Sequence, residues 1–306
     1  MLQLTDIKKS FGSRLVLDSI SFEVPDGQVT GFVGGNGAGK TTTMRIIMGL
    51  LKANSGKVLW DGQPMSAGIT GRAGYMPEER GLYPKMKVNE QLVYLARLHG
   101  LGKALAEERT GDLLERLGLA ARANSKVEEL SLGNQQRAQI AAALVQDPGW
   151  LILDEPFSGL DPIAVDAVMA VLREFADQGV PILFSSHQLD LVERITDNLV
   201  ILADGQIKAS GPTVQLQRSY AGQRFWLEAE GDLGWVAQEP GVGETTLQDG
   251  KVLFDAESPA AQGVLKAALV RGPVFGFGRH LPTLAEVFRE VIKDEVPADQ
   301  EEAVAA

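Results

Sequence analysis

The sequence predicts an α/β fold in which a central, mostly parallel sheet packs against helices. Three features of the 306-residue chain support this prediction. Apolar strand-like segments alternate with helix-like segments, a glycine-rich turn joins one strand to one helix, and the composition changes after about residue 217. We therefore expect a large α/β domain over residues 1–217 and a small α+β domain over residues 218–295.

The large domain is expected to begin with β-structure and to continue with alternating helices and strands. Strand-like alternation and a turn at Pro25-Asp26-Gly27 characterise its first part. Apolar residues at helical spacing predict that residues 86–123 are helical. Strands are expected at 2–7, 20–24, 29–33, 150–153, 181–185 and 198–202, and further helices at 41–50, 135–146, 163–177 and 188–196.

The small domain is expected to combine short strands with two helices. The strands are expected at 225–230, 251–255 and 274–277, and the helices at 260–270 and 284–291. Residues 296–306 are acidic and then alanine-rich, which is typical of a disordered tail. Because no segment repeats, we expect each functional motif only once in the chain.

The composition argues against several classes of function. With 29 Lys and Arg against 40 Asp and Glu, the net charge of -11 opposes contact with a phosphate backbone, so no direct nucleic acid binding is expected. The chain has no cysteine, which excludes disulfides and thiolate metal sites. It shows neither a signal peptide nor an apolar run of about 20 residues, so we expect it to serve any membrane from outside the bilayer.

A phosphate-binding loop is predicted directly after the strand at 29–33. Residues 34–41 fit the pattern G-x-x-x-x-G-K-[ST] between a strand and a helix. The glycines let main-chain N–H groups turn toward a phosphate, and the helix N-terminus adds positive potential. Lys40 can reach the β- and γ-phosphates, and the Thr41 hydroxyl can ligate Mg²⁺. The candidate nucleotide-binding residues here are Gly34, Gly35, Asn36, Gly37, Ala38, Gly39, Lys40, Thr41 and Thr42.

A second candidate site lies at the end of the apolar strand at 150–153. Asp154 and Glu155 follow this strand directly. We expect Asp154 to lie beside Mg²⁺ and Glu155 to face the γ-phosphate, where its carboxylate can orient or deprotonate the attacking water. An apolar run followed by Asp-Glu is weak evidence by itself, because many strands end in acidic turns. The phosphate-binding loop is therefore what favours a hydrolytic role.

Taken together, the motifs of residues 2–217 resemble those of the ABC (ATP-binding cassette) ATPases, in the same order along the chain. Four further segments carry this resemblance. The adenine-stacking segment of the family resembles Lys9-Ser10-Phe11-Gly12, and its LSGGQ motif resembles Leu130-Ser131-Leu132-Gly133-Asn134-Gln135-Gln136-Arg137. Its D-loop resembles Pro156-Phe157-Ser158-Gly159-Leu160-Asp161, and its switch-histidine region resembles Ser185-Ser186-His187. The resemblance implies a P-loop NTPase core of the ABC type, with an N-terminal antiparallel β region and a helical subdomain at about 86–146.

The resemblance also implies roles for single residues. Phe11 would stack on adenine, and His187 would join Glu155 as a catalytic residue by contacting the γ-phosphate. Taken singly, Phe11 is more typical of a core aromatic, Ser131 of a helix N-cap and His187 of a structural histidine. The implied contacts to the nucleotide outside the phosphate loop are Phe11, Ser131, Gly133, Asn134 and Asp161, and the implied ligands of Mg²⁺ are Thr41, Glu78 and Asp154.

Four positions depart from the usual pattern of the family, and one of them, Gly35 where the family often has Pro, should be harmless. Glu78 stands where the family usually has Gln, so this side chain can ligate Mg²⁺ but cannot donate a hydrogen bond. Leu132 replaces the first glycine of the LSGGQ motif and Asn134 its glutamine. These changes, together with residues 281–288, resemble a bacterial subgroup of ABC-2-type exporter ATPases that includes sodium-efflux ATPases.

The sequence thus predicts an ATP-binding and ATP-hydrolysing subunit, with ATP and Mg²⁺ as cofactors, that energises an exporter. The resemblance implies a homodimer, or a heterodimer with a paralogue, that closes head to tail on ATP. It would act on a separately encoded permease at the cytoplasmic face of the membrane and be soluble when expressed alone.

Two alternatives remain open. The first is a soluble ABC ATPase that acts on ribosomes or DNA. Such chains usually carry tandem cassettes or a long insertion, for which the interval between Lys40 and Asp154 leaves no room. The second is a regulator with an inactive site, which ranks last because Lys40, Asp154, Glu155 and His187 are all present.

Overall fold

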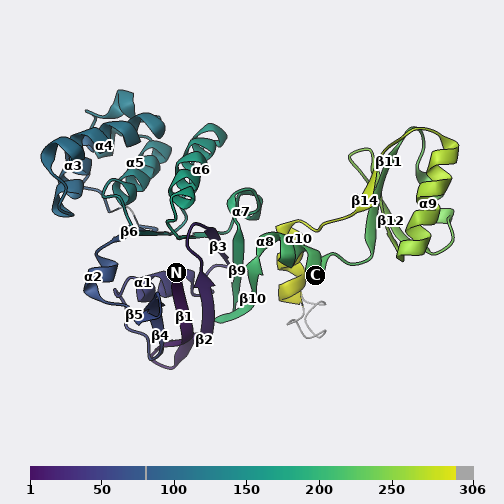
Figure 1. Ribbon diagram of the computed structural model, residues 1–306, viewed down its shortest axis with the longest axis horizontal. Coiled ribbons are helices and arrows are strands. Elements are labelled where there is room, and N and C mark those ends of the chain that lie inside the picture. The colour runs from purple at the N-terminus through teal and green to yellow at the C-terminus, as the bar shows by residue number, and fades with distance from the viewer. Residues whose placement is uncertain (80, 294–306) are drawn as a thin grey trace, which may run out of the picture. The chain divides into compact units, whose positions relative to one another are not determined.

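The computed structural model describes residues 1–79 and 81–293. This part of the chain divides into two compact units, residues 1–213 with 291–293 and Val214–Glu290. In the first unit, a group of helices accompanies two sheets, and in the second a helix accompanies one sheet (Figure 1). The predicted disordered tail, residues 296–306, lies outside the described residues.

A six-stranded sheet forms the centre of the first unit. Its strands are β3 (Val29–Val33), β6 (Ala73–Met76), β7 (Trp150–Leu153), β8 (Ile182–Ser186), β9 (Asn198–Ala203) and β10 (Gln206–Pro212). They lie in the order β10-β9-β3-β8-β7-β6, and only the β10–β9 pair is antiparallel. Every residue of β3, β7 and β8 is buried, as expected for parallel strands covered on both faces. The predicted mostly parallel sheet is therefore confirmed.

The second sheet of this unit is antiparallel, as the sequence predicts for the N-terminal region. Its strands are β1 (Leu2–Phe11), β2 (Arg14–Val24), β4 (Ser55–Trp60) and β5 (Gln63–Pro64), in the order β2-β1-β4-β5. The predicted strands at 2–7 and 20–24 were too short, because the β1–β2 hairpin continues until Phe11 pairs with Arg14. Near this hairpin β1 carries polar residues 8–10, and the apolar Phe11 and Leu15 are exposed, so these strand ends lack the apolar alternation that identifies a strand.

The helices of the first unit include a group that packs mainly on itself. They are α1 (Lys40–Ile47), α2 (Ala67–Thr70), α3 (Val88–Leu98), α4 (Lys103–Arg116), α5 (Leu132–Leu144), α6 (Pro162–Asp177) and α7 (Leu189–Ile195), with short 3-10 turns η1 (Ala120–Arg122) and η2 (Val127–Glu129). Helices α3, α4 and α5 pack against one another, and this group is visible beside α6 in Figure 1. None of the described helices is both long and apolar enough to cross a bilayer.

Two predicted helix boundaries were wrong. Helix α1 ends at Ile47 rather than at residue 50, because Gly49 adopts a left-handed conformation (φ 70°) that ends a helix. Helix α5 begins at Leu132 rather than at residue 135, because the Ser131 side chain caps it by accepting a hydrogen bond from the Asn134 N–H. The LSGGQ-like motif therefore forms the first turn of a helix.

The second unit is an antiparallel sheet covered by one helix. Its strands are β11 (Arg224–Ala229), β12 (Val242–Gln248), β13 (Lys251–Ala256) and β14 (Val274–Arg279), in the order β12-β13-β11-β14, and its further elements are η3 (Gly234–Gln238) and α9 (Ser258–Arg271). The Phe225 ring stacks on Phe254 and Phe277, with centroids 6.1 and 5.9 Å away. Helices α8 (Thr213–Tyr220) and α10 (Leu284–Lys293) precede and follow this sheet in sequence.

Candidate functional site

A cavity of about 360 Å³ lies beside the phosphate loop, where β3 leads into α1. Parallel strands β3 and β7 deliver the loop and the two acidic residues to the same edge of the sheet. The cavity is lined by Val16, Asn36, Gly37, Gly39, Lys40, Thr41, Thr42, Glu78, Asp154 and Glu155. All of these except Val16 are residues that the sequence singles out, so the fold gathers them at one place.

The phosphate loop requires glycine at two points. Gly39 has a φ of 114°, and a Cβ there would lie 2.5 Å from the Leu17 Cδ2. A Cβ on Gly34 would lie 2.4 Å from the Leu202 carbonyl oxygen. The Lys40 ammonium donates hydrogen bonds to the carbonyls of Gly34 (2.7 Å) and Gly35 (3.2 Å), so it stays against the loop that would hold a phosphate.

Asp154 presents a buried oxygen that has no hydrogen-bond partner. Its side chain is 1% exposed, and its Oδ1 accepts a hydrogen bond from the Ser185 Oγ at 2.5 Å. Its Oδ2 is buried and finds no partner among the described residues. Such an oxygen needs a cation or a donor. Because Thr41 and Glu78 bring further oxygens to the same cavity, the donor set fits Mg²⁺.

Glu155 has its backbone in the left-handed region and its side chain paired with His187. Its φ is 52°, which is unusual for a residue other than glycine. The Ser185 Oγ accepts a hydrogen bond from the Glu155 N–H at 2.9 Å, so one hydroxyl positions both acidic residues. The His187 Nδ1 lies 3.0 Å from the Glu155 Oε2. This contact orients the carboxylate that lines the cavity.

Tyr75 lies on β6 next to these acids. Burial, followed by the negative charge of Asp154, raises the pKa of its phenol above the ordinary value of 10. Tyr75 itself lines a neighbouring cavity and not the phosphate-loop cavity.

The LSGGQ-like residues lie on a separate surface at the start of α5. Neither Ser131 nor Gly133 nor Asn134 lines the phosphate-loop cavity. The Asn134 carboxamide oxygen accepts a hydrogen bond from Arg137, and the half-exposed Leu132 packs over the D-loop. A Cβ on Gly159 would lie 3.1 Å from the Leu132 Cγ.

Phe11 and Asp161 also lie outside the cavity lining. Phe11 is 51% exposed at the end of β1, so the interpretation as a core aromatic is wrong. The Lys9 ammonium lies 4.9 Å from the centroid of its ring. Asp161 is the N-cap of α6, and its Oδ1 accepts a hydrogen bond from the Ala164 N–H at 2.9 Å.

Sequence reasoning missed three residues at this site. Val16 lines the cavity and also a neighbouring one of about 540 Å³, which Gly35 and Ala38 share. Ser185 and Gln136 stand within quoted motifs but were given no role. A strand valine has no distinguishing pattern, and the other two act through hydrogen bonds that only the fold creates.

Known proteins resemble the chain over both of its parts. A family model described as ABC transporter matches residues 17–158, and one described as ATP-binding protein DrrA1-3-like, C-terminal domain, matches residues 211–292. The uncharacterized ABC transporter ATP-binding protein YhaQ of Bacillus subtilis is 40% identical over 95% of this chain and 98% of its own length. The Nod factor export ATP-binding protein I of Cupriavidus metallidurans is 36% identical over 72% of this chain and 74% of its own.

A solved structure of an ATP binding subunit of an ABC transporter agrees with these matches. It superposes with a TM-score of 0.67 and 33% identity over 72% of this chain and 93% of its own. The phosphate loop, the acidic strand and this fold define a P-loop ATPase. The chain belongs to the family of ABC transporter ATP-binding proteins, and it is an ATP-binding ABC ATPase with exporter-type relatives.

Proposed function

We propose that the chain is the ATP-hydrolysing subunit of an exporter and that it acts on a separately encoded permease. The observation that carries this proposal is the single cavity that holds the phosphate loop, Asp154 and Glu155. The relative named for Nod factor export supports the direction of transport. The subunit would lie at the cytoplasmic face of the membrane, held there by the permease.

Two copies are proposed to close head to tail around two ATP molecules. Ser131 and Gly133 lie at a helix N-terminus, where main-chain N–H groups favour an anion, and neither residue lines this chain's own phosphate-loop cavity. In the proposed dimer they contact the γ-phosphate of the partner's ATP. ATP then stabilises the closed dimer more than ADP does, and this difference drives the permease.

Hydrolysis is proposed to depend on Glu155. Its carboxylate orients and deprotonates a water that attacks the γ-phosphate, giving ADP and phosphate, while His187 holds the carboxylate and senses the phosphate. Lys40 and the loop N–H groups bind the phosphates. Thr41, Glu78 and Asp154 would hold Mg²⁺, which neutralises charge on the phosphates when it is bound.

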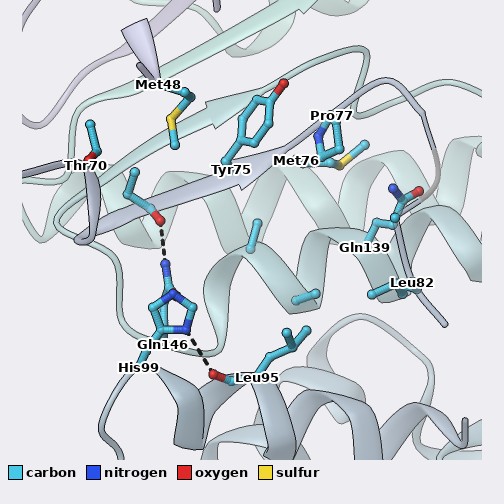
Figure 2. A pocket seen from close by; sticks show the side chains of 14 residues that line it. Met48, Thr70, Tyr75, Met76, Pro77, Leu82, Leu95, His99, Gln139 and Gln146 are labelled. Carbon is cyan, nitrogen blue, oxygen red and sulfur yellow. Dashed lines mark hydrogen bonds between the residues drawn. The ribbon is translucent and has the colours of Figure 1, made fainter. Parts of the chain in front are cut away.

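A second cavity is proposed to receive the permease. It measures about 350 Å³ and lies between β6, α3 and α5, with mostly apolar walls. Figure 2 shows Tyr75, Met76 and Pro77 on one side and Leu95 and His99 on another. The strand residues directly precede Glu78, so a cytoplasmic segment of the permease seated here would contact the chain next to the proposed metal ligand.

Affinity purification from native membranes in mild detergent tests this proposal. Stoichiometric recovery of a polytopic membrane protein with the tagged, ATPase-active chain is expected. Leu82→Asp, which places a charge in the second cavity, should lose this partner and keep ATP binding. Leu247→Asp changes an exposed leucine of the other unit and is the matched control. Recovery of ribosomal proteins, or of no membrane protein, would favour the soluble ABC ATPase instead.

A further inference from the structure

Helix α5 holds the segment from Glu155 to Gly159 at two points. The Gln136 Nε2 donates hydrogen bonds to the carbonyls of Glu155 (2.9 Å) and Pro156 (3.1 Å). One turn earlier, Leu132 packs over Gly159. Gln136 is 7% exposed, so water competes little for these hydrogen bonds.

The backbone of Glu155 depends on such support. A left-handed conformation at a residue with a Cβ is disfavoured and persists only where surrounding contacts hold it. The Glu155 N–H donates to the Ser185 Oγ, and its C=O accepts from the Gln136 Nε2 at 2.9 Å and, less closely, from the Ser158 N–H at 3.2 Å. Side chains from β8 and from α5 therefore hold both main-chain groups of this strained residue, and the turn at Ser158 adds a weaker contact to the carbonyl.

A second glutamine on α5 makes a parallel contact. Gln139 lies three residues after Gln136 and therefore on the same face of the helix. Its Nε2 donates to the carbonyl of Glu79, which directly follows Glu78. One face of α5 thus contacts both segments that bring carboxylates to the phosphate-loop cavity.

We propose that Gln136 is a positioning residue for hydrolysis. By holding the carbonyls of Glu155 and Pro156, it fixes the direction of the Glu155 carboxylate and joins it to the helix that begins at Ser131. This inference rests on the proposed function, in which Ser131 contacts the ATP of the partner. Gln136 then links the nucleotide bound at one site to the catalytic carboxylate of the other site.

Steady-state ATPase kinetics of the full-length chain test this role. Gln136→Met keeps the volume of the side chain and removes both donors, while Gln136→Asn keeps the amide but shortens its reach. Both variants are expected to lower kcat about ten- to a hundredfold, the loss typical of a misplaced catalytic group, and to change the Kd for ATP less than twofold.

The matched control is Gln91→Met. Gln91 is 2% exposed and also makes two hydrogen bonds to main-chain atoms, but both go to Tyr83, which does not line the phosphate-loop cavity. This variant should leave kcat within twofold of wild type. An equal loss of kcat in Gln91→Met would show that any buried amide matters and would overturn the proposed role.

A double-mutant cycle separates positioning from a structural effect. In a Glu155→Gln background, where the carboxylate is gone, Gln136→Met should cause no further loss in single-turnover assays. A further loss by the factor that Gln136→Met causes in the wild-type background, or a Kd for ATP that rises as kcat falls, would overturn the positioning role of Gln136. Either result would leave the proposed function standing. A wild-type chain that hydrolyses no ATP would overturn the proposed function as well.

Discussion

Asp154→Asn should make the nucleotide-free protein more stable while it removes the response to Mg²⁺. The buried Oδ2 of Asp154 has no hydrogen-bond partner among the described residues. An unsatisfied buried polar group costs about 1–3 kcal/mol, and more if it is charged. Asparagine keeps the acceptor for Ser185 and replaces the charged oxygen with a neutral amide. We expect the free energy of unfolding to rise by about 1 kcal/mol, which raises Tm by about 2–4 °C.

Thermal unfolding under three conditions measures both effects. The wild type and the variant are compared without nucleotide, with ATP and EDTA, and with ATP and Mg²⁺. A ligand at about a hundred times its Kd adds about 2.7 kcal/mol, so tighter binding of the magnesium complex raises the Tm of the wild type above its value with ATP alone. The variant should lack this additional increase.

The control for this experiment is Asp147→Asn. Asp147 is exposed, pairs with Arg109 at 3.0 Å and lies outside the phosphate-loop cavity. This variant should keep the Mg²⁺-dependent increase in Tm. The reasoning would be refuted if Asp154→Asn lowered Tm without nucleotide, or if it kept the Mg²⁺-dependent increase.

Two further variants test single contacts. Phe11→Ala should weaken ATP binding about three- to tenfold, because it removes a stacking face worth about 0.5–1.5 kcal/mol. Phe11→Tyr should retain the affinity. Equal Kd values by calorimetry for wild type and Phe11→Ala would argue against stacking. Glu78→Gln should keep the Kd for ATP and change the rate of ATP turnover severalfold, because it removes one negative charge from the cavity. A turnover rate equal to that of wild type, both for the chain alone and for the chain with the permease, would contradict a role for this charge.

Four strands of the central sheet, β3, β7, β8 and β9, could be predicted because nearly all of their residues are buried, whereas β6 and β10 were missed. Strands β3 and β7 are fully buried, and both have the bounds that the sequence predicts; β7 is a continuous apolar run. Strand β4 was missed because it has no fully buried residue, and β12 because most of its residues are exposed. Partial exposure removes the periodic signal on which sequence reasoning depends.

The candidate site also contains residues that the sequence predicts and residues that it does not. The phosphate loop has the fixed spacing that its chemistry requires, Asp154 and Glu155 directly follow the apolar strand β7, and the fold brings the loop and these acids into one cavity. The supporting contacts of Gln136 and Ser185 join residues distant in sequence through main-chain atoms. No residue pattern encodes such contacts, because they arise only when β7, β8 and α5 are packed together.

The mass of the Glu155→Gln variant in solution, measured by light scattering with ATP, tests the account most directly. Without the catalytic carboxylate, bound ATP should persist and hold two copies together. The account predicts a dimer with ATP and Mg²⁺, and a monomer with ADP or without nucleotide. A monomer at saturating ATP, or ATP turnover equal to that of wild type, would contradict it.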